Sequence, residues 1–220
     1  MTAPTVLITG ASRGLGREVA LRLAARGYQV IAGMRCPEPL EDLEVLPLDV
    51  ADATSVTAAA RAVEATHGGL DVLVNNAGIL LDEDEGPLDL GADTLRRTLE
   101  TNALGPLRMV QAFAPLMASG GRVVMVSSGG GQLSAPSTWA PAYCVSKTAL
   151  NALTVQLAEA LKPRGIAVNA VCPGWVRTDM GGPSAPRSLA EGAESILWPI
   201  LEAGPEVTGG FWRDGKRLPW

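Results

Sequence analysis

Short apolar runs alternate along the chain with longer segments of helical periodicity. Runs of roughly four to eight mostly apolar residues, many of them β-branched, are typical of buried strands. The strands predicted in this way fall within residues 5–10, 28–35, 43–50, 70–78, 121–128, 166–174 and 209–215. Between them, apolar residues recur three or four positions apart, which predicts helices over 15–27, 51–69, 93–119, 142–165 and 188–204.

Single residues add detail to two of these helices. Asp52 or Thr54 is expected to cap the helix over 51–69, because short polar side chains accept hydrogen bonds from free amides at a helix start. Gly105 and Pro106 lie inside the helix over 93–119, and a proline there removes a helical hydrogen bond. We therefore expect this second helix to bend at Gly105-Pro106.

The alternation of strand and helix predicts an α/β fold. Continuous apolar strands are typical of a parallel sheet that helices cover on both faces. Right-handed crossovers then give a doubly wound, Rossmann-type sheet of about seven strands. Neither a linker nor an internal repeat stands out, so we predict a single domain over residues 1–220 with its substrate site built in.

The composition narrows the class of protein. Hydrophobic residues make up 47% of the 220 residues, and the net charge is −5. An acidic chain without a Lys/Arg-rich block is not expected to bind nucleic acid, and no run approaches the ~20 apolar residues of a membrane span. Three separated cysteines and one histidine predict neither a metal site nor a disulfide scaffold. The N-terminus lacks the pattern of a signal peptide, so we expect a cytoplasmic protein.

A glycine-rich turn, TGASRGLG at 9–16, lies where the first predicted strand meets the first helix. Gly10, Gly14 and Gly16 permit a tight turn and a close approach to a ligand. The start of the following helix suits a pyrophosphate. The spacing differs from the GxGxxG fingerprint, so an ordinary tight turn is the alternative interpretation. Its place at the first strand–helix junction favours a dinucleotide site.

The end of the second predicted strand bears on which nicotinamide cofactor would bind. A carboxylate there usually holds the ribose of NAD, whereas an arginine accommodates the 2′-phosphate of NADP. Arg35 has this place, and Arg13 lies in the glycine turn, so two guanidinium groups could clamp one phosphate. The alternative is that both are solvated loop arginines. We favour NADP(H) over NAD(H).

Tyr143 and Lys147 stand at positions i and i+4 of a predicted helix, so their side chains share one face, ~6 Å apart along the axis. A free phenol has a pKa of about 10, and a nearby ammonium is expected to lower it and so make the tyrosine a usable proton donor. Ser128 ends the strand before this helix, at the sheet edge where such folds bind ligands. By itself, the pair also fits a core-edge tyrosine beside a surface lysine.

Together these motifs resemble the short-chain dehydrogenase/reductase family, and most closely its carbonyl-reductase-like members. The resemblance covers nearly the whole chain in the family's order. The matching segments are TGASRGLG (9–16), LDV (48–50), NNAG (75–78), ETNALG with Asn102, SS (127–128), YCVSK (143–147) and PGWVRTDM (173–180).

This resemblance implies a role for each matching residue. Tyr143 would protonate a substrate carbonyl that Ser128 orients, and Lys147 would lower the pKa of the tyrosine and hydrogen-bond the nicotinamide ribose. Asn102 would hold a water that links Lys147 to solvent. Tyr143 and Lys147 would also contact the cofactor, and the other implied contacts are Gly10, Ser12, Arg13, Gly14, Leu15, Gly16, Arg35, Asp49, Val50, Asn76, Ala77, Gly78, Pro173, Gly174, Val176 and Thr178.

Several of these assignments have alternatives. The Gly/Ser/Pro-rich stretch that follows Ser128 is longer than is usual in the family, so Ser127 and Ser134 are alternatives to Ser128. Asn102 could simply bend its helix. Trp139 could form a wall of the pocket or anchor its own loop.

The expected function is the NADPH-dependent reduction of a small carbonyl compound, reversible as the oxidation of an alcohol. One alternative is a non-catalytic NADP-binding regulatory or scaffold protein, and another is an NAD-linked alcohol dehydrogenase. The resemblance is compatible with a homodimer or homotetramer assembled through the helices over 93–119 and 142–165, although some carbonyl-reductase-like members are monomers.

Overall fold

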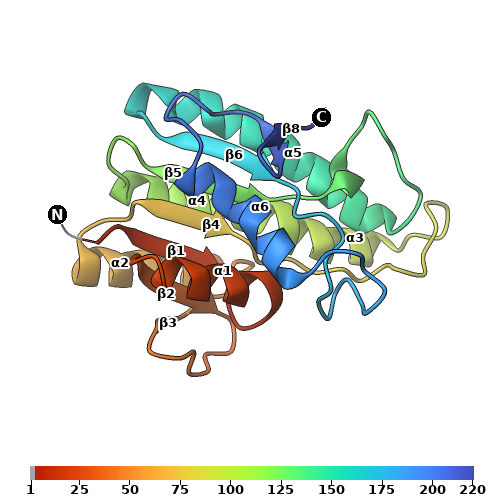
Figure 1. Ribbon diagram of the computed structural model, residues 1–220. Helices are drawn as coiled ribbons and strands as arrows, with labels where there is room; N and C mark the ends of the chain where they lie inside the picture. The colour runs from red at the N-terminus through yellow and green to blue at the C-terminus, as the bar shows by residue number, and fades with distance from the viewer. Residues whose placement is uncertain (1–2) are drawn as a thin grey trace.

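In the computed structural model, which describes residues 3–220, eight strands form one sheet with the order β3-β2-β1-β4-β5-β6-β7-β8 (Figure 1). All neighbouring strands are parallel except β7 and β8. From β1 the chain adds β2 and β3 on one side of the sheet. It then crosses to the other side of β1, where β4 to β8 follow in order. The strands are β1 (Thr5–Thr9), β2 (Gln29–Met34), β3 (Glu44–Pro47), β4 (Val72–Asn75), β5 (Arg122–Val126), β6 (Ala167–Val171), β7 (Phe211–Arg213) and β8 (Lys216–Arg217).

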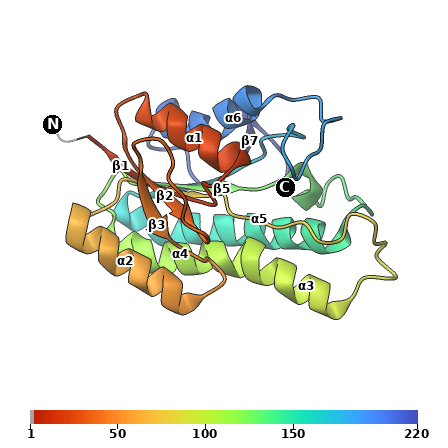
Figure 2. The ribbon, with the colours of Figure 1, turned by 90° about the horizontal axis from the view of Figure 1, so that it is seen from below.

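Helices cover both faces of this sheet, as predicted (Figure 2). α1 (Gly14–Ala24) and α6 (Leu189–Leu201) lie on one face, and α2 (Ala53–His67), α4 (Gly105–Phe113) and α5 (Pro141–Leu161) lie on the other. Short 3₁₀-helices span Ala114–Leu116, Gly129–Gly131 and Lys162–Arg164. Alternate strand residues enter separate hydrophobic clusters: Leu7 packs on the side of α2 and α4, and Val6 and Ile8 pack on the side of α1 and α6. Within residues 3–220, no helix is long and apolar enough to cross a membrane.

The structure has one strand more than the seven predicted. The segment over 209–215 contains β7 and a turn, and the chain then returns as β8 to form a hairpin. β7 and β8 pair antiparallel across Asp214 and Gly215, whose φ angles are 51° and 72°. Positive φ at both central residues is typical of a type I′ turn, in which Asp-Gly is a preferred pair. The predicted strand over 209–215 is therefore present at Phe211–Arg213, and its last two residues form the turn.

Two predicted helix details are also resolved. Asp52, not Thr54, caps α2, since its Oδ1 accepts the N–H of Thr54 at 2.8 Å. The helix predicted over 93–119 is divided: α3 (Ala92–Leu99) passes through a π-helical turn at Glu100–Leu104 before α4 begins. Pro106 has no N–H to donate to the carbonyl of Asn102 four residues earlier, which disfavours a regular α-helix here.

The loop after β4 is tied to the glycine turn after β1. Asn76 donates from Nδ2 to the carbonyl oxygens of Thr9 and Gly10, at 3.0 and 3.2 Å. Gly16 packs into the same junction, where a Cβ would lie 2.4 Å from the Gly10 oxygen and 2.5 Å from the Asn76 amide nitrogen. The junction therefore requires glycine at position 16. It holds the loops after β1 and β4 together at the carboxyl edge of the sheet.

Replacing Gly16 with alanine is expected to lower the free energy of unfolding by about 1–3 kcal/mol, because the added methyl group would force backbone and amide apart. Urea denaturation measures this change. Gly86→Ala is the control, since a Cβ there would meet only the Asp89 Oδ2, at 3.6 Å. Equal stability of the Gly16→Ala variant and the wild-type protein would contradict the packing argument.

Candidate functional site

A cavity of about 940 Å³ opens at the carboxyl edge of the sheet. The loops after β1, β4, β5 and β6 line it, together with the start of α5 and the end of β7. In Figure 1 these loops gather at the right, where the β1 arrow points. This is the edge at which doubly wound sheets bind ligands.

Nearly all residues expected to hold a nucleotide line this cavity. Gly16 does not; it lies buried behind the glycine turn and shapes it. Besides Tyr143 and Lys147, the expected residues at the wall are Gly10, Ser12, Arg13, Gly14, Leu15, Arg35, Asp49, Val50, Asn76, Ala77, Gly78, Pro173, Gly174, Val176 and Thr178.

The two arginines expected to clamp a phosphate differ in their surroundings. Arg35 is exposed directly after β2, and within residues 3–220 it forms no ion pair. Arg13 is also exposed, but its Nη1 lies 2.7 Å from Oδ2 of Asp179. Such an exposed pair adds little stability, yet the carboxylate competes for the guanidinium. Arg35 is thus the freer of the two cations.

Ser128, Tyr143 and Lys147 meet at one wall of the cavity. Ser128 follows β5, and its Oγ accepts the N–H of Gly130 at 3.1 Å. Tyr143 lies in the first turn of α5, and the Nζ of Lys147, one turn later, is 5.5 Å from its ring centroid. That Nζ donates to the carbonyl oxygen of Val126 at 2.8 Å. The strand end and the helix start thereby bring all three groups together.

Burial determines the acidity of Tyr143 and Lys147. It raises the pKa of Tyr143 to about 12, while hydrogen bonding with the Ser128 hydroxyl acts in the opposite direction. Burial lowers the pKa of Lys147 to about 8. We expected a pKa of Tyr143 below that of a free phenol, and the net shift is upward instead, because desolvation of the phenol outweighs the effect of a nearby ammonium. At neutral pH Tyr143 is a neutral phenol and can donate a proton.

Of the three candidate serines, Ser128 is the one whose hydroxyl faces Tyr143. Ser127 also touches the cavity, but its Oγ donates inward to Oδ1 of Asn151 at 2.6 Å. Ser134 is exposed and does not line the cavity. The structure therefore favours Ser128 as the group that would contact a bound carbonyl.

Asn102 lies beneath the cavity and does not form part of its wall. Its Oδ1 accepts the N–H of Ile79 at 2.8 Å, and its Nδ2 donates to the Ile79 oxygen at 2.8 Å and to Ser146 Oγ at 3.0 Å. These bonds occupy the side chain, so Asn102 fixes the loop after β4. The main-chain carbonyl of Asn102 lacks its usual i+4 donor because residue 106 is proline, so it offers an acceptor for the water that the resemblance implies.

Asp82, which the sequence motifs did not single out, anchors the start of α5. Ala140 precedes this helix and offers no capping side chain. The Oδ2 of Asp82 accepts instead the N–H groups of Ala142 at 2.5 Å and Tyr143 at 3.4 Å. Asp82 is 1% exposed, and a carboxylate at a helix N-terminus is favoured by the helix dipole. It thus helps to fix the backbone that carries the phenol.

The rest of the wall near Tyr143 is largely apolar. The rings of Trp139 and Tyr143 pack edge to face, with 6.1 Å between their centroids. Trp139 also lines the cavity, so it forms part of the wall. Trp175 and Met180 line the same cavity. Arg213, to which the motifs gave no role, adds a charged group there. This wall suits an organic molecule with an apolar part.

Comparison with known proteins gives consistent matches. A model of the short chain dehydrogenase family matches residues 4–188. Short-chain dehydrogenase anuI of Penicillium roqueforti is 34% identical over 94% of this chain and 92% of that protein. The NADPH-bound carbonyl reductase from chicken fatty liver has a TM-score of 0.90 and 28% identity, with 100% of both chains covered. An NADP-bound short-chain dehydrogenase/reductase from Burkholderia multivorans has a TM-score of 0.89 and 29% identity, covering 99% of this chain and 100% of that one.

Replacing Lys147 with methionine is expected to change how stability depends on pH. The folded-state pKa of about 8 lies below the ordinary 10.5, so between these values the unfolded state binds more protons and wild-type stability rises with pH. From about pH 7 to about pH 9.5, the wild-type protein should gain ~2 kcal/mol relative to Lys147→Met, measured by urea denaturation at each pH. Lys162→Met removes an exposed lysine just after α5 and is the control. A stability difference between wild type and Lys147→Met that does not vary with pH would contradict a lowered pKa of Lys147 in the folded protein.

Proposed function

The chain belongs to the short-chain dehydrogenase family of NAD(P)-dependent oxidoreductases, and on that premise we propose that it reduces a small carbonyl compound with NADPH. The observation that carries the proposal is the meeting of Ser128, Tyr143 and Lys147 at one wall of a large cavity. The reverse reaction would oxidise the corresponding alcohol. Carbonyl reductases are among the solved structures that this chain resembles.

The residues present fit NADP(H). Gly10 has a φ of 67°, and a Cβ there would lie 2.9 Å from the Cα of Ala77, so the turn keeps a bare backbone. No side chain caps α1, which leaves its first N–H groups for a pyrophosphate. Arg35 would take the 2′-phosphate. The NADPH and NADP in the two structural relatives support the same choice. Bound NADPH would supply the hydride.

Tyr143 would protonate the carbonyl oxygen as the alcohol forms. Its pKa of about 12 keeps the phenol protonated at neutral pH. The nearby ammonium of Lys147 would favour the negative charge that develops on the phenol oxygen as the proton leaves. Ser128 Oγ accepts the N–H of Gly130, and its O–H, which faces Tyr143, would donate to the same carbonyl oxygen once a substrate binds.

After each turnover the phenolate must regain a proton, and Lys147 would supply it. A pKa of about 8 lets this ammonium lose a proton near neutral pH at little cost. A Cβ at Gly78 would lie 3.7 Å from the Lys147 Nζ and 3.4 Å from the Asn102 Oδ1, so both groups border the same point. Asn102 would hold a connecting water through its main-chain carbonyl.

The catalytic reading is favoured over a non-catalytic NADP-binding protein, because binding alone does not require a serine, a phenol and a buried ammonium at one wall. A single domain, a cytoplasmic location and assembly into a homodimer or homotetramer stay predictions from the sequence.

Replacing Tyr143 with phenylalanine is expected to lower kcat/KM by ~10²–10⁴-fold, because the proton donor is removed while the ring remains. Oxidation of NADPH with a panel of ketones, aldehydes and quinones measures this loss, and fluorescence titration should show NADPH affinity within about threefold of wild type. Tyr28→Phe, the change at the chain's other tyrosine, is the control. The proposal fails if Tyr143→Phe turns over at the wild-type rate, and NADPH binding without turnover by the wild-type protein would favour the scaffold alternative.

Replacing Arg35 with aspartate is expected to reduce the preference for NADPH over NADH by roughly 10- to 100-fold in kcat/KM. The aspartate would repel the 2′-phosphate and could accept hydrogen bonds from the ribose diol of NADH. Steady-state kinetics with both cofactors measure the ratio. Arg61→Asp makes the same charge change at an exposed position outside the cavity and is the control. A wild-type protein that prefers NADH would favour the NAD-linked alternative.

A further inference from the structure

Arg213 places a positive charge in the cavity wall close to the expected carbonyl site. It ends β7 and lines the same cavity as Ser128 and Tyr143. Its Nη2 lies 2.8 Å from the Sγ of Cys172 and 3.3 Å from the point that a Cβ on Gly129 would occupy. Gly129 directly follows Ser128. The guanidinium therefore lies beside the strand end that carries the carbonyl-orienting serine.

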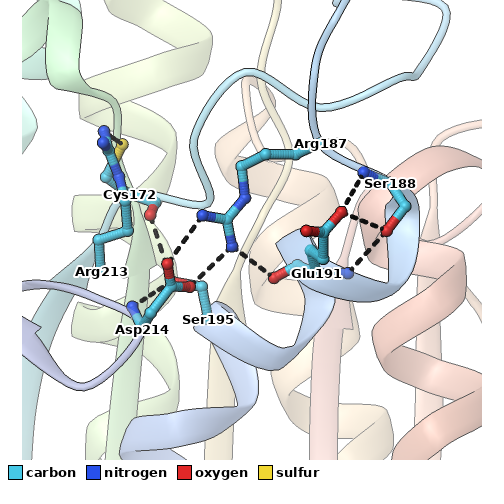
Figure 3. Close-up of polar contacts among 7 residues, drawn as sticks. All are labelled: Cys172, Arg187, Ser188, Glu191, Ser195, Arg213 and Asp214. Carbon is cyan, nitrogen blue, oxygen red and sulfur yellow. Dashed lines mark hydrogen bonds and ion pairs between the residues drawn. The ribbon is translucent and has the colours of Figure 1, made fainter.

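No carboxylate of the described residues pairs directly with this guanidinium. Within residues 3–220, no Asp or Glu oxygen lies at ion-pair distance from Arg213, although Asp214 is its neighbour in the chain. Figure 3 shows why: both Asp214 oxygens accept from Arg187, each at 2.7 Å. The N–H of Asp214 donates to Ser195 Oγ at 3.0 Å, and Ser195 donates to the Cys172 oxygen at 3.2 Å. These bonds direct the Asp214 carboxylate to Arg187.

The bonding of the Arg213 guanidinium is also incomplete. Its Nε is buried without a hydrogen-bond partner, and Cys172 sulfur, its one side-chain acceptor among the described residues, accepts only weakly. A partly buried cation is unfavourable unless an anion pairs with it. Arg13 and Arg35 lie on the nucleotide side of the cavity, and the acidic Glu83 and Asp84 are exposed loop residues. The ammonium of Lys147 also lies near Ser128, but it already donates to the Val126 carbonyl oxygen. An anion bound beside Ser128 would therefore find in Arg213 a cation that no carboxylate pairs.

We propose that Arg213 binds a carboxylate of the substrate, so that the preferred substrates are oxo-carboxylic acids with an apolar part. The carboxylate would pair with the guanidinium while the ketone oxygen lies between Ser128 and Tyr143. The apolar part would pack on Trp139 and Trp175. This inference rests on the proposed function: the ketone carbon takes a hydride from NADPH, its oxygen takes the Tyr143 proton, and a hydroxy acid and NADP⁺ result.

The test compares acids with their neutral methyl esters in the protein–NADP⁺ complex by isothermal titration calorimetry. The probes are 2-oxo-4-phenylbutanoate and 4-oxo-4-phenylbutanoate, which place the carboxylate at two distances from the ketone, each with its methyl ester. At least one acid is expected to bind wild type roughly 10- to 100-fold more tightly than its ester. Arg213→Gln should abolish this preference and leave ester affinity within about threefold, while Arg213→Lys should retain part of it.

Arg217→Gln removes an exposed arginine of β8 outside the cavity and should keep the full preference, which makes it the matched control. If Arg213→Gln does not fold, the wild-type preference is measured in about 0.05 M and about 0.5 M NaCl, where screening should reduce it. Acids that bind no more tightly than their esters in wild type, or a preference that survives Arg213→Gln or high salt unchanged, overturn the inference.

Oxidation of NADPH is measured separately from binding of the acids and esters. The two measurements distinguish the proposed reductase function from the proposed role of Arg213. If the acids bind through Arg213 but neither acids nor esters are reduced by NADPH, the carboxylate site stands and the proposed reductase function does not. If esters are reduced and the acids show no advantage in binding, the reductase function stands and the role of Arg213 is refuted.

Discussion

The ammonium of Lys147 is held out of water, and the site is arranged around that constraint. Lys147 is 4% exposed and donates to the Val126 carbonyl oxygen. A buried charge is stable only where neighbours supply acceptors and leave room for it. Gly78, without a side chain, leaves that room, and the π-helical turn brings Asn102 beneath the same point. Because burial disfavours any charged form, it moves an ammonium and a phenol in opposite directions: the lysine releases its proton more easily, and the tyrosine keeps its own.

The order of strands and helices could be predicted from the sequence because continuous apolar runs indicate buried strands. Parallel strands buried between two layers of helices are what this fold requires. Local backbone geometry was harder to predict. The strand predicted over 209–215 ran two residues past the apolar pair Phe211-Trp212 and Arg213, into Asp214-Gly215, although Asp-Gly is itself a turn signal. The π-helical turn has a visible cause in Pro106, but periodicity alone did not indicate how the chain would accommodate it.

The candidate site was predictable where chemistry follows from spacing along the chain. The glycine turn, Ser128 and the Tyr143–Lys147 pair are of this kind. Asp82 and Arg213 are not, because their contacts with α5 and Cys172 span 60 and 41 positions. The direction of the Tyr143 pKa shift was missed for a related reason: spacing of i and i+4 shows that an ammonium is near, but not how strongly the surrounding protein desolvates the phenol.

Asp82 divides the loop after β4 into two parts with different freedom to vary. Up to Asp82, the backbone is held by Asn102 through Ile79 and by the start of α5. From Glu83 onward, the loop reaches the cavity through exposed side chains, Glu83 and Asp84, that hold no helix in place. Substitutions at Glu83 and Asp84, by evolution or in a laboratory library, would therefore change the shape and charge of this part of the cavity wall. They would leave the backbone that carries Tyr143 in place.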